Sequence, residues 1–342
     1  MKLVTMDVHS DMCTAGIYHG KGSDVHEIGT RVIPTNIPQL KAFLKGLPGQ
    51  HVLVIEEGPL APWLKRHLTH LVRRFIVTNP RRNALIFANG EKDDFKDLAD
   101  LATIYVNKSY REVYHTDNKQ RQQLKDQVLH YHDHTQTIAA VKSKIKALYR
   151  AYGIRVKGDS LYSEEHREYW IEKISSDTSP QIVIDLYDLL QTIERIQEGI
   201  LKRLRKLSKP FEIVKRFQKI PAIGPVSAVS FFAIIDTPWR FKSIESIYKY
   251  CGLAVVNKSS NGKWLSRPGL NKDCNHIMKS LMLRAGHNAK LSKSILNTYY
   301  QHHLKRGLTA AAAKNHTARK IVRTMISMWK HDTHFDPDKI MK

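Results

Sequence analysis

The stretch that decides the fold is Met1-Lys2-Leu3-Val4-Thr5-Met6-Asp7, an apolar run that ends on a carboxylate. Such a run is typical of a short strand, and we expect residues 2–7 to form one. Further carboxylates follow at Glu56, after another apolar run, and at Asp94 and Asp97. A strongly basic chain has little reason to gather acids unless they hold a cation, so these four residues indicate a metal site.

The composition bounds the class of protein. The chain has 342 residues, of which 42% are hydrophobic, enough for two domains and a helical connector. Lysine and arginine number 55 against 32 acids, and the resulting charge of +23 is spread along the chain. This distribution indicates an extended surface for a polyanion, most simply nucleic acid. The alternative is a basic protein with a solvated charged face.

The cysteines, Cys13, Cys251 and Cys274, are widely spaced and form no CxxC pair. No disulfide framework is indicated, which fits a reducing cytoplasm. No apolar run approaches the length of a membrane span, and the N-terminus lacks the layout of a signal peptide. We therefore expect a cytoplasmic protein with no membrane partner.

The first part of the chain, residues 1–108, alternates strand-like and helix-like segments. The order strand-strand-strand-helix-strand-helix-strand-helix predicts a ribonuclease-H-like (RuvC-like) α/β domain. The expected strands cover residues 2–7, 12–19, 25–33, 51–56 and 75–77, and the expected helices cover residues 37–46, 60–71 and 94–106.

The second part, residues 109–210, has apolar residues at spacings of three, four and seven. This period predicts two long helices, one from about residue 117 and one after Pro180, which form a coiled-coil hairpin around the irregular segment 153–179. The apolar seam closes either on itself or on a second subunit. We favour a dimer, because two such helices alone would leave much apolar surface exposed.

The third part, residues 211–342, is predicted to be mainly helical, with helices near 242–251, 272–288 and 308–330. Residues 220–228, Ile-Pro-Ala-Ile-Gly-Pro-Val-Ser-Ala, have the layout of a helix-hairpin-helix turn. Gly224 would let the backbone approach a phosphate, and the next helix would offer its N-terminal amides. The alternative is a tight turn with no ligand.

The acids suit Mg²⁺, because phosphoryl transfer assisted by two metal ions needs hard oxygen ligands on rigid elements. Asp94 and Asp97 are three residues apart on a predicted helix, so they point the same way. Asp93 and Glu57 stand beside two of the chosen acids, and the sequence pattern alone leaves these alternatives open. Each acid taken singly is more simply a surface residue.

The segment between the last helices, residues 251–269, is polar, basic and contains glycine. A serine here, flanked by Lys258 and Lys263 and near Arg267, could attack a phosphodiester while the cations stabilise the anionic transition state. The alternative is a flexible or phosphate-contacting loop. The histidines at 130, 132 and 134 do not predict zinc, because only two of them share a helix face and further ligands are missing.

Together these motifs resemble the transposases of bacterial insertion sequences that have an Asp-Glu-Asp-Asp catalytic set, the relatives of the Piv invertase that include bridge-RNA-guided recombinases. The resemblance extends over essentially the whole chain. The segments that carry it are Met-Asp-Val-His-Ser at 6–10, Val-Ile-Glu-Glu-Gly at 54–58, Lys-Asp-Asp-Phe-Lys-Asp-Leu-Ala at 92–99, Ile-Pro-Ala-Ile-Gly-Pro at 220–225, Tyr-Cys-Gly-Leu at 250–253, Asn-His-Ile-Met-Lys at 275–279 and Phe-Asp at 335–336.

The resemblance implies roles for individual residues. Asp7, Glu56, Asp94 and Asp97 would bind Mg²⁺, and Ser260 would attack the scissile phosphate to form a covalent phosphoserine link. Gly224 and Lys279 would join Lys258, Lys263 and Arg267 in binding nucleic acid. The motif at 92–99 selects Asp94 over Asp93, whereas Glu57 and Ser259 remain alternatives to Glu56 and Ser260.

The resemblance also implies a function and partners. A structured guide RNA would choose donor and target DNA, strand exchange would follow, and the acids and the serine would meet between subunits of a homodimer or homotetramer associated with the nucleoid. The nearest rival is a Holliday-junction nuclease that uses the four acids and water. A second rival is a non-catalytic nucleic-acid-binding protein.

Overall fold

The computed structural model describes residues 2–21, 24–80, 94–116, 118–174, 179–260 and 263–341. For residues 21, 24, 94, 179, 257–260 and 263–268 the description covers the backbone alone. The chain divides into two compact units, Met1–Asp117 and Asn118–Lys342. The first is an α/β unit with a mixed sheet and the second is mainly helical.

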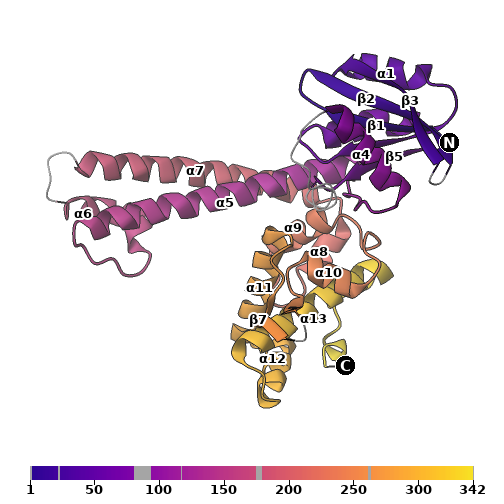
Figure 1. Ribbon diagram of the computed structural model, residues 1–342. Helices are drawn as coiled ribbons and strands as arrows, with labels where there is room; N and C mark the ends of the chain where they lie inside the picture. The colour runs from indigo at the N-terminus through magenta and orange to yellow at the C-terminus, as the bar shows by residue number, and fades with distance from the viewer. Residues whose placement is uncertain are drawn as a thin grey trace. The chain divides into compact units, whose positions relative to one another are not determined.

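The first unit contains a five-stranded sheet in the order β3-β2-β1-β4-β5 (Figure 1). Strands β1 to β3 form an antiparallel meander, and β4 and β5 run parallel to β1. The elements follow the predicted order: β1 Lys2–Val8, β2 Met12–Lys21, β3 Asp24–Pro34, α1 Ile37–Gly46, β4 His51–Glu56, α2 Ala61–Leu68, β5 Arg74–Thr78 and α4 Asp94–Val106.

Both faces of this sheet are covered, because alternate residues of each strand point to opposite sides. On one face Met6 and Leu53 pack against Leu40 of α1 and Leu64 of α2. On the other face the core joins two groups of buried residues. They are Leu3, Val52, Val54 and Ile76 from the strands and Leu101, Ala102 and Ile104 from α4.

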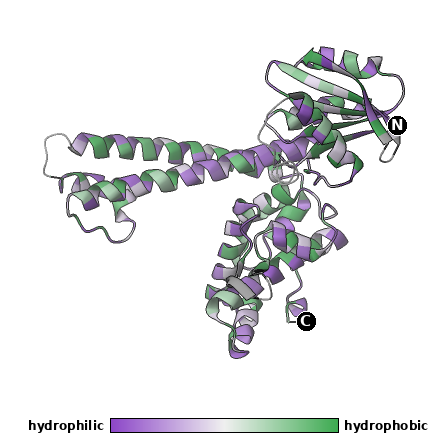
Figure 2. Cartoon of the chain, in the orientation of Figure 1, coloured by the Kyte–Doolittle hydropathy of each residue, from purple (hydrophilic) through white to green (hydrophobic). Residues whose placement is uncertain are grey.

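The second unit begins with a long hairpin formed by α5, Lys119–Ala151, and α7, Ser179–Ser208, with the short α6, Arg167–Ile171, near its tip (Figure 1). Hydrophobic and hydrophilic residues alternate around both helices (Figure 2). Val141 and Ile145 of α5 and Ile193 of α7 are buried together in the hairpin, whereas Ile182, Leu189 and Ile196, spaced seven apart, are exposed.

The base of the hairpin and the C-terminal helices share one core, in which Leu124 and Ile200 pack with the apolar α9. Close approach of α11 and α13 requires a glycine, because a Cβ at Gly286 would lie 2.6 Å from the Lys314 carbonyl oxygen. The helices of this part are α8 Glu212–Phe217, α9 Pro225–Ile235, α10 Ile244–Tyr250, α11 His276–Leu291, α12 Ile295–Lys305 and α13 Ala310–His331.

The segment predicted as a polar loop is instead an antiparallel hairpin of β6, Val255–Ser260, and β7, Lys263–Leu270. The prediction of a loop was wrong because it weighed polarity over two hairpin signals. Val255 and Val256 are β-branched, and Asn261-Gly262, which lies outside the described residues, is a dipeptide typical of two-residue turns. Among the described helices none is long and apolar enough to cross a membrane.

Candidate functional site

Asp7 and Glu56 are placed by the register of two parallel strands. Met6 of β1 pairs with Ile55 of β4, and each carboxylate follows one residue later. Because side chains alternate along a strand, Asp7 shares its face with Leu3, and Glu56 shares its face with Val54. Both of these apolar residues belong to the core under α4. The two carboxylates therefore occupy neighbouring strand ends on the α4 side of the sheet.

The other two acids lie in the first turn of helix α4, which begins at Asp94. Asp94 precedes the buried Leu98 by four residues, and Asp97 precedes the buried Leu101 by four. At the other end of α4, Tyr105 lies within electrostatic reach of Arg74, the first residue of β5. The N-terminus of α4 is thus directed toward the carboxyl ends of the parallel strands. Asp97 is exposed, and the side chain of Asp94 lies outside the description.

Glu57, the alternative to Glu56, has a different environment. Its carboxylate lies 2.7 Å from Nε2 of His115, whose side chain is only 10% exposed. Its backbone N–H donates to the carbonyl of Thr78. Glu57 is therefore held within the first unit by its own partners. Asp93, the alternative to Asp94, lies outside the described residues.

The four acids would supply only carboxylate oxygens to a metal ion. Asp7 lies 2.9 Å from Nε2 of His9, which offsets its charge when the imidazole is protonated. Within the described side chains, no group of three or more histidine, cysteine or acidic residues is arranged to hold an ion. The donors are nevertheless all carboxylate oxygens, the ligand type that Mg²⁺ prefers, and Asp7 and Glu56 share one face of the sheet.

The hairpin of β6 and β7 carries the predicted serine near its tip. Ser260 is the last residue of β6 and pairs with Lys263, while Ser259 pairs with Trp264. Only the backbone is described here, so the side chains of Ser260, Lys258, Lys263 and Arg267 lie outside the description.

The base of this hairpin is held by a polar clamp. The carbonyl of Leu253, just before β6, accepts from Nε and Nη2 of Arg319 at 2.9 and 2.5 Å and from Nδ2 of Asn315 at 3.2 Å. Just after β7, the buried Asn271 donates its N–H to the Ala254 carbonyl at 2.8 Å. Both ends of the hairpin are therefore tied to the helical core.

Lys279 belongs to the same clamp. We predicted that it binds nucleic acid, but its ammonium donates to the Asn271 carbonyl at 2.8 Å. Its aliphatic stem packs on Gly252, where a Cβ would lie 2.7 Å from Lys279 Cδ and from Cys274 Sγ. Gly252 also has φ of +64°, which disfavours other residues. The Tyr-Cys-Gly-Leu segment thus needs its glycine for packing as well as for conformation.

Gly224 lies at the start of α9, beside an open pocket of about 370 Å³ lined by residues 218–224 and Asn288. Its φ of −82° and ψ of 173° are ordinary extended values, and a Cβ there would meet nothing within 4 Å. The left-handed residue of this turn is Ala222, with φ of 72°. Close approach to a ligand is thus sterically open at Gly224, although its backbone angles do not require glycine.

The central histidine of 130, 132 and 134 has a packing role. Nε2 of His132 lies 2.9 Å from the Ser230 hydroxyl of α9. Burial, followed by the nearby charge of Arg284, lowers the pKa of His132 to about 4. His132 is therefore neutral at physiological pH and bonds α5 to α9.

Comparison with known families concerns the second unit. Residues 214–301 match the Transposase IS116/IS110/IS902 family. This match supports an insertion-sequence transposase. It implies DNA substrates and an enzyme that cuts and rejoins DNA. The matched region includes Gly224, the hairpin with Ser260, and Lys279, whereas the four acids lie outside it. No curated protein matches the chain.

Several residues at the site were not predicted from the sequence. Arg319 lies in the helix predicted near 308–330, and nothing in the sequence links it to Leu253. Asn315 and Asn271 likewise lack a local signal, because their partners are distant or are backbone atoms. For the hairpin, the β-branched Val255 and Val256 and the Asn-Gly dipeptide at 261–262 were the available signals.

Proposed function

We propose that this protein is the RNA-guided recombinase of an insertion sequence, and that it cuts and rejoins donor and target DNA with a serine nucleophile and an acid-bound Mg²⁺ ion. The observation that carries the proposal is the transposase match over residues 214–301, which includes the hairpin with Ser260. The register of β1 and β4, which places Asp7 and Glu56 at neighbouring strand ends, supports the proposed Mg²⁺ site.

The first unit would supply the acids from a ribonuclease-H-like sheet. The strand order β3-β2-β1-β4-β5, with an antiparallel meander followed by two parallel strands, supports that assignment. Asp7, Glu56, Asp94 and Asp97 would hold Mg²⁺, which when bound would polarise the scissile phosphate. Glu56 is preferred over Glu57 because it lies on the same face of the sheet as Asp7.

The second unit would supply the nucleophile. The Ser260 oxygen would form a bond to the scissile phosphorus, and the bond from phosphorus to one deoxyribose oxygen would break. That oxygen takes up the proton lost by the serine and leaves as a hydroxyl group. The phosphoserine link is itself a phosphodiester, so the number of such bonds is unchanged. The reverse attack by a hydroxyl of another strand would rejoin the DNA. Lys258, Lys263 and Arg267 would offset the charge that develops on the phosphate.

The partners follow from charge and exposed apolar surface. A formal charge of +23 suits a complex with DNA and a structured guide RNA, whose recognition depends on many phosphate contacts. The exposed Ile182, Leu189 and Ile196 form a stripe with heptad spacing on α7. Such a stripe is expected to pack against another subunit, in a homodimer or homotetramer.

The serine and the acids can be tested separately. Purified protein would be incubated with DNA carrying the element's ends, with Mg²⁺ or with a chelator, and protein-linked DNA would be separated on denaturing gels. We expect Ser260→Ala to abolish the covalent adduct and strand exchange, with Ser259→Ala as the matched control. We expect Asp7→Asn and removal of Mg²⁺ to abolish both products while DNA binding is retained.

Other results would favour the rivals. Normal cleavage by Ser260→Ala would indicate a junction nuclease that uses water. Absence of cutting by the wild-type protein, with DNA binding unaffected by Asp7→Asn, would indicate a non-catalytic binding protein. Mixing the two inactive variants tests the composite site, because activity should return if the acids of one subunit act with the serine of another. Sequencing of co-purified RNA tests the guide, since a defined RNA supports the proposal and random fragments contradict it.

A further inference from the structure

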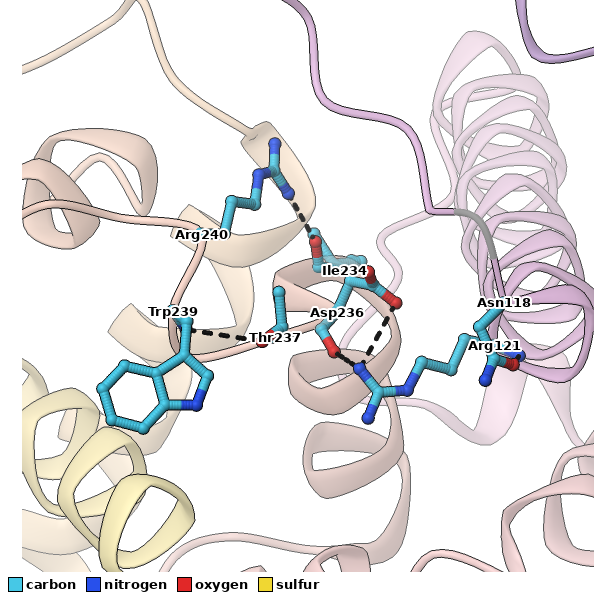
Figure 3. Close-up of polar contacts among 7 residues, drawn as sticks. All are labelled: Asn118, Arg121, Ile234, Asp236, Thr237, Trp239 and Arg240. Carbon is cyan, nitrogen blue, oxygen red and sulfur yellow. Dashed lines mark hydrogen bonds and ion pairs between the residues drawn. The ribbon is translucent and has the colours of Figure 1, made fainter. Parts of the chain in front are cut away.

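Trp239 is a large aromatic side chain that the fold leaves in solvent. The residue is 70% exposed. It lies in the connection between α9 and α10, in a turn closed by the Arg240 N–H donating to the Thr237 carbonyl at 3.3 Å. The backbone N–H of Trp239 donates to the Thr237 hydroxyl at 3.4 Å (Figure 3). With Pro238 at the second position, the turn presents the indole at its third position.

This turn is braced from several sides. Asp236, immediately before it, is 3% exposed and has φ of +66° and ψ of −49°, a conformation that persists only where surrounding contacts impose it. Arg121 of α5 donates to the Asp236 carbonyl and lies 3.9 Å from its carboxylate. On the far side of the turn, Arg240 donates to the Ile234 carbonyl at 3.1 Å (Figure 3). The indole is therefore held outward on a rigid support.

The surroundings of Trp239 carry excess positive charge. The Lys330 ammonium lies 5.0 Å from the indole ring centre. The carboxylates of Asp236, before the turn, and of Asp332, two residues after Lys330, are paired with Arg121 and Arg216. Lys242, three residues after Trp239, adds a further positive charge to this part of the chain. A partner for this surface should therefore be planar and apolar on one side and anionic on the other.

Tyr169, near the tip of the long hairpin, shows that exposure alone does not define such a surface. It is 56% exposed, and the Lys173 ammonium lies 4.4 Å from its ring centre. Its neighbours Glu168 and Glu172 are acidic, however. Tyr169 therefore resembles Trp239 in having an exposed aromatic ring beside a lysine ammonium. It lacks the excess positive charge, which makes it a matched control.

We propose that Trp239 is a stacking platform for an unpaired base of the nucleic acid that this protein binds, with Lys330 contacting the adjacent phosphate. A nucleotide combines a planar base with an anionic phosphate, which matches the indole and its cations. The rigid turn lowers the entropy lost on binding, because the ring is already in place. The inference deepens the proposed function by naming a contact for unpaired strands, and it requires only that the protein binds nucleic acid.

The test measures binding without catalysis. Full-length protein would be titrated into fluorescein-labelled 12-nucleotide DNA and RNA single strands and a blunt DNA duplex, in chelator, with anisotropy as the readout. Stacking on an aromatic side chain strengthens binding of a base about 5- to 150-fold. We therefore expect Trp239→Ala to weaken single-strand binding by a factor in this range and to change duplex binding less than about 2-fold. Trp239→Tyr should restore most of the affinity, and Tyr169→Ala should have no effect.

Specific outcomes would overturn the proposal. They are unchanged single-strand binding by Trp239→Ala, equal loss of single-strand and duplex binding, or no rescue by tyrosine. If Trp239→Ala does not fold, the fluorescence of wild-type protein and of Trp239→Phe is compared during titration with oligothymidylate and with polyphosphate. Quenching specific to Trp239 and to the oligonucleotide supports stacking, and equal quenching in both proteins contradicts it. Because binding is measured in chelator and without catalysis, its outcome is independent of the test for the serine nucleophile.

Discussion

The guanidinium of Arg319 on α13 donates two hydrogen bonds to the carbonyl of Leu253, 66 residues earlier, at the start of the β6–β7 hairpin. Leu253 is fully buried, so its carbonyl has no access to water that could replace these donors. The position of the hairpin that carries Ser260 is therefore coupled to the packing of α13.

Replacing Arg319 should loosen this hairpin. We expect Arg319→Met to lower the free energy of unfolding by about 2 kcal/mol, because a buried carbonyl loses charged donors. Amide hydrogen exchange in β6 and β7 should accelerate. Arg323→Met, on the exposed side of the same helix, serves as the control and should change stability by less than about 0.5 kcal/mol. Equal effects of the two variants in urea unfolding would contradict the role of the clamp.

Two glycines of the matched region should differ sharply. Gly252→Ala is expected to cost more than about 2 kcal/mol, because it combines a left-handed φ with contacts of 2.7 Å. Gly224→Ala should cost less than about 1 kcal/mol, since its φ is −82° and the space around it is open. Urea unfolding of both variants measures the loss in the free energy of unfolding. Similar losses would contradict the tight packing at Gly252 and the open space at Gly224.

Glu56 and Glu57 should separate function from stability. We expect Glu56→Gln to abolish DNA cutting without a change in stability. Glu57→Gln should retain cutting and lose at most about 1 kcal/mol, the contribution of its partly exposed pair with His115. DNA-cutting assays and thermal unfolding of both variants show which glutamate is needed for cutting and which contributes to stability. The opposite pattern would identify Glu57 as the catalytic acid.

His132 should make the second unit sensitive to acid. Its pKa is lowered from 6.5 to about 4 in the folded state, so the unfolded chain binds the proton more readily between these values. This contribution to stability is present above pH 6.5 and is lost as the pH falls toward 4. Because His132 is partly exposed, we expect a loss of about 2 kcal/mol. His132→Gln, which cannot titrate, should show a smaller loss in urea unfolding across this pH range.

The exposed stripe on α7 should govern self-association. We expect Leu189→Glu to shift the protein to a smaller species in light scattering after size exclusion, because a charge at the centre of an apolar interface is costly. Ser143→Glu, at an exposed position of α5, adds the same charge away from the stripe and should leave the mass unchanged. A monomeric wild type, or loss of association in both variants, would rule out this interface.

Local patterns in the sequence were sufficient to predict the secondary structure of the first unit and the long helices of the second. The apolar run in Lys2–Val8 reflects burial on both faces of the sheet, and the spacing of three and four in Lys119–Ala151 reflects burial of one side of the helix. The hairpin of Val255–Ser260 and Lys263–Leu270 was missed, although its valines and its Asn-Gly dipeptide were present in the sequence. The metal ligands and Ser260 stay predictions.

Only the tertiary structure showed which distant groups meet. It placed Arg319 on the Leu253 carbonyl, Glu57 on His115, and Lys330 beside the exposed ring of Trp239. The physical reason is that periodicity records which side of an element is buried, whereas a hydrogen bond between distant residues depends on how the elements pack. The sequence by itself therefore determined the elements and the positive charge of this protein, and packing determined which residues form its clamp and which aromatic side chain remains in solvent.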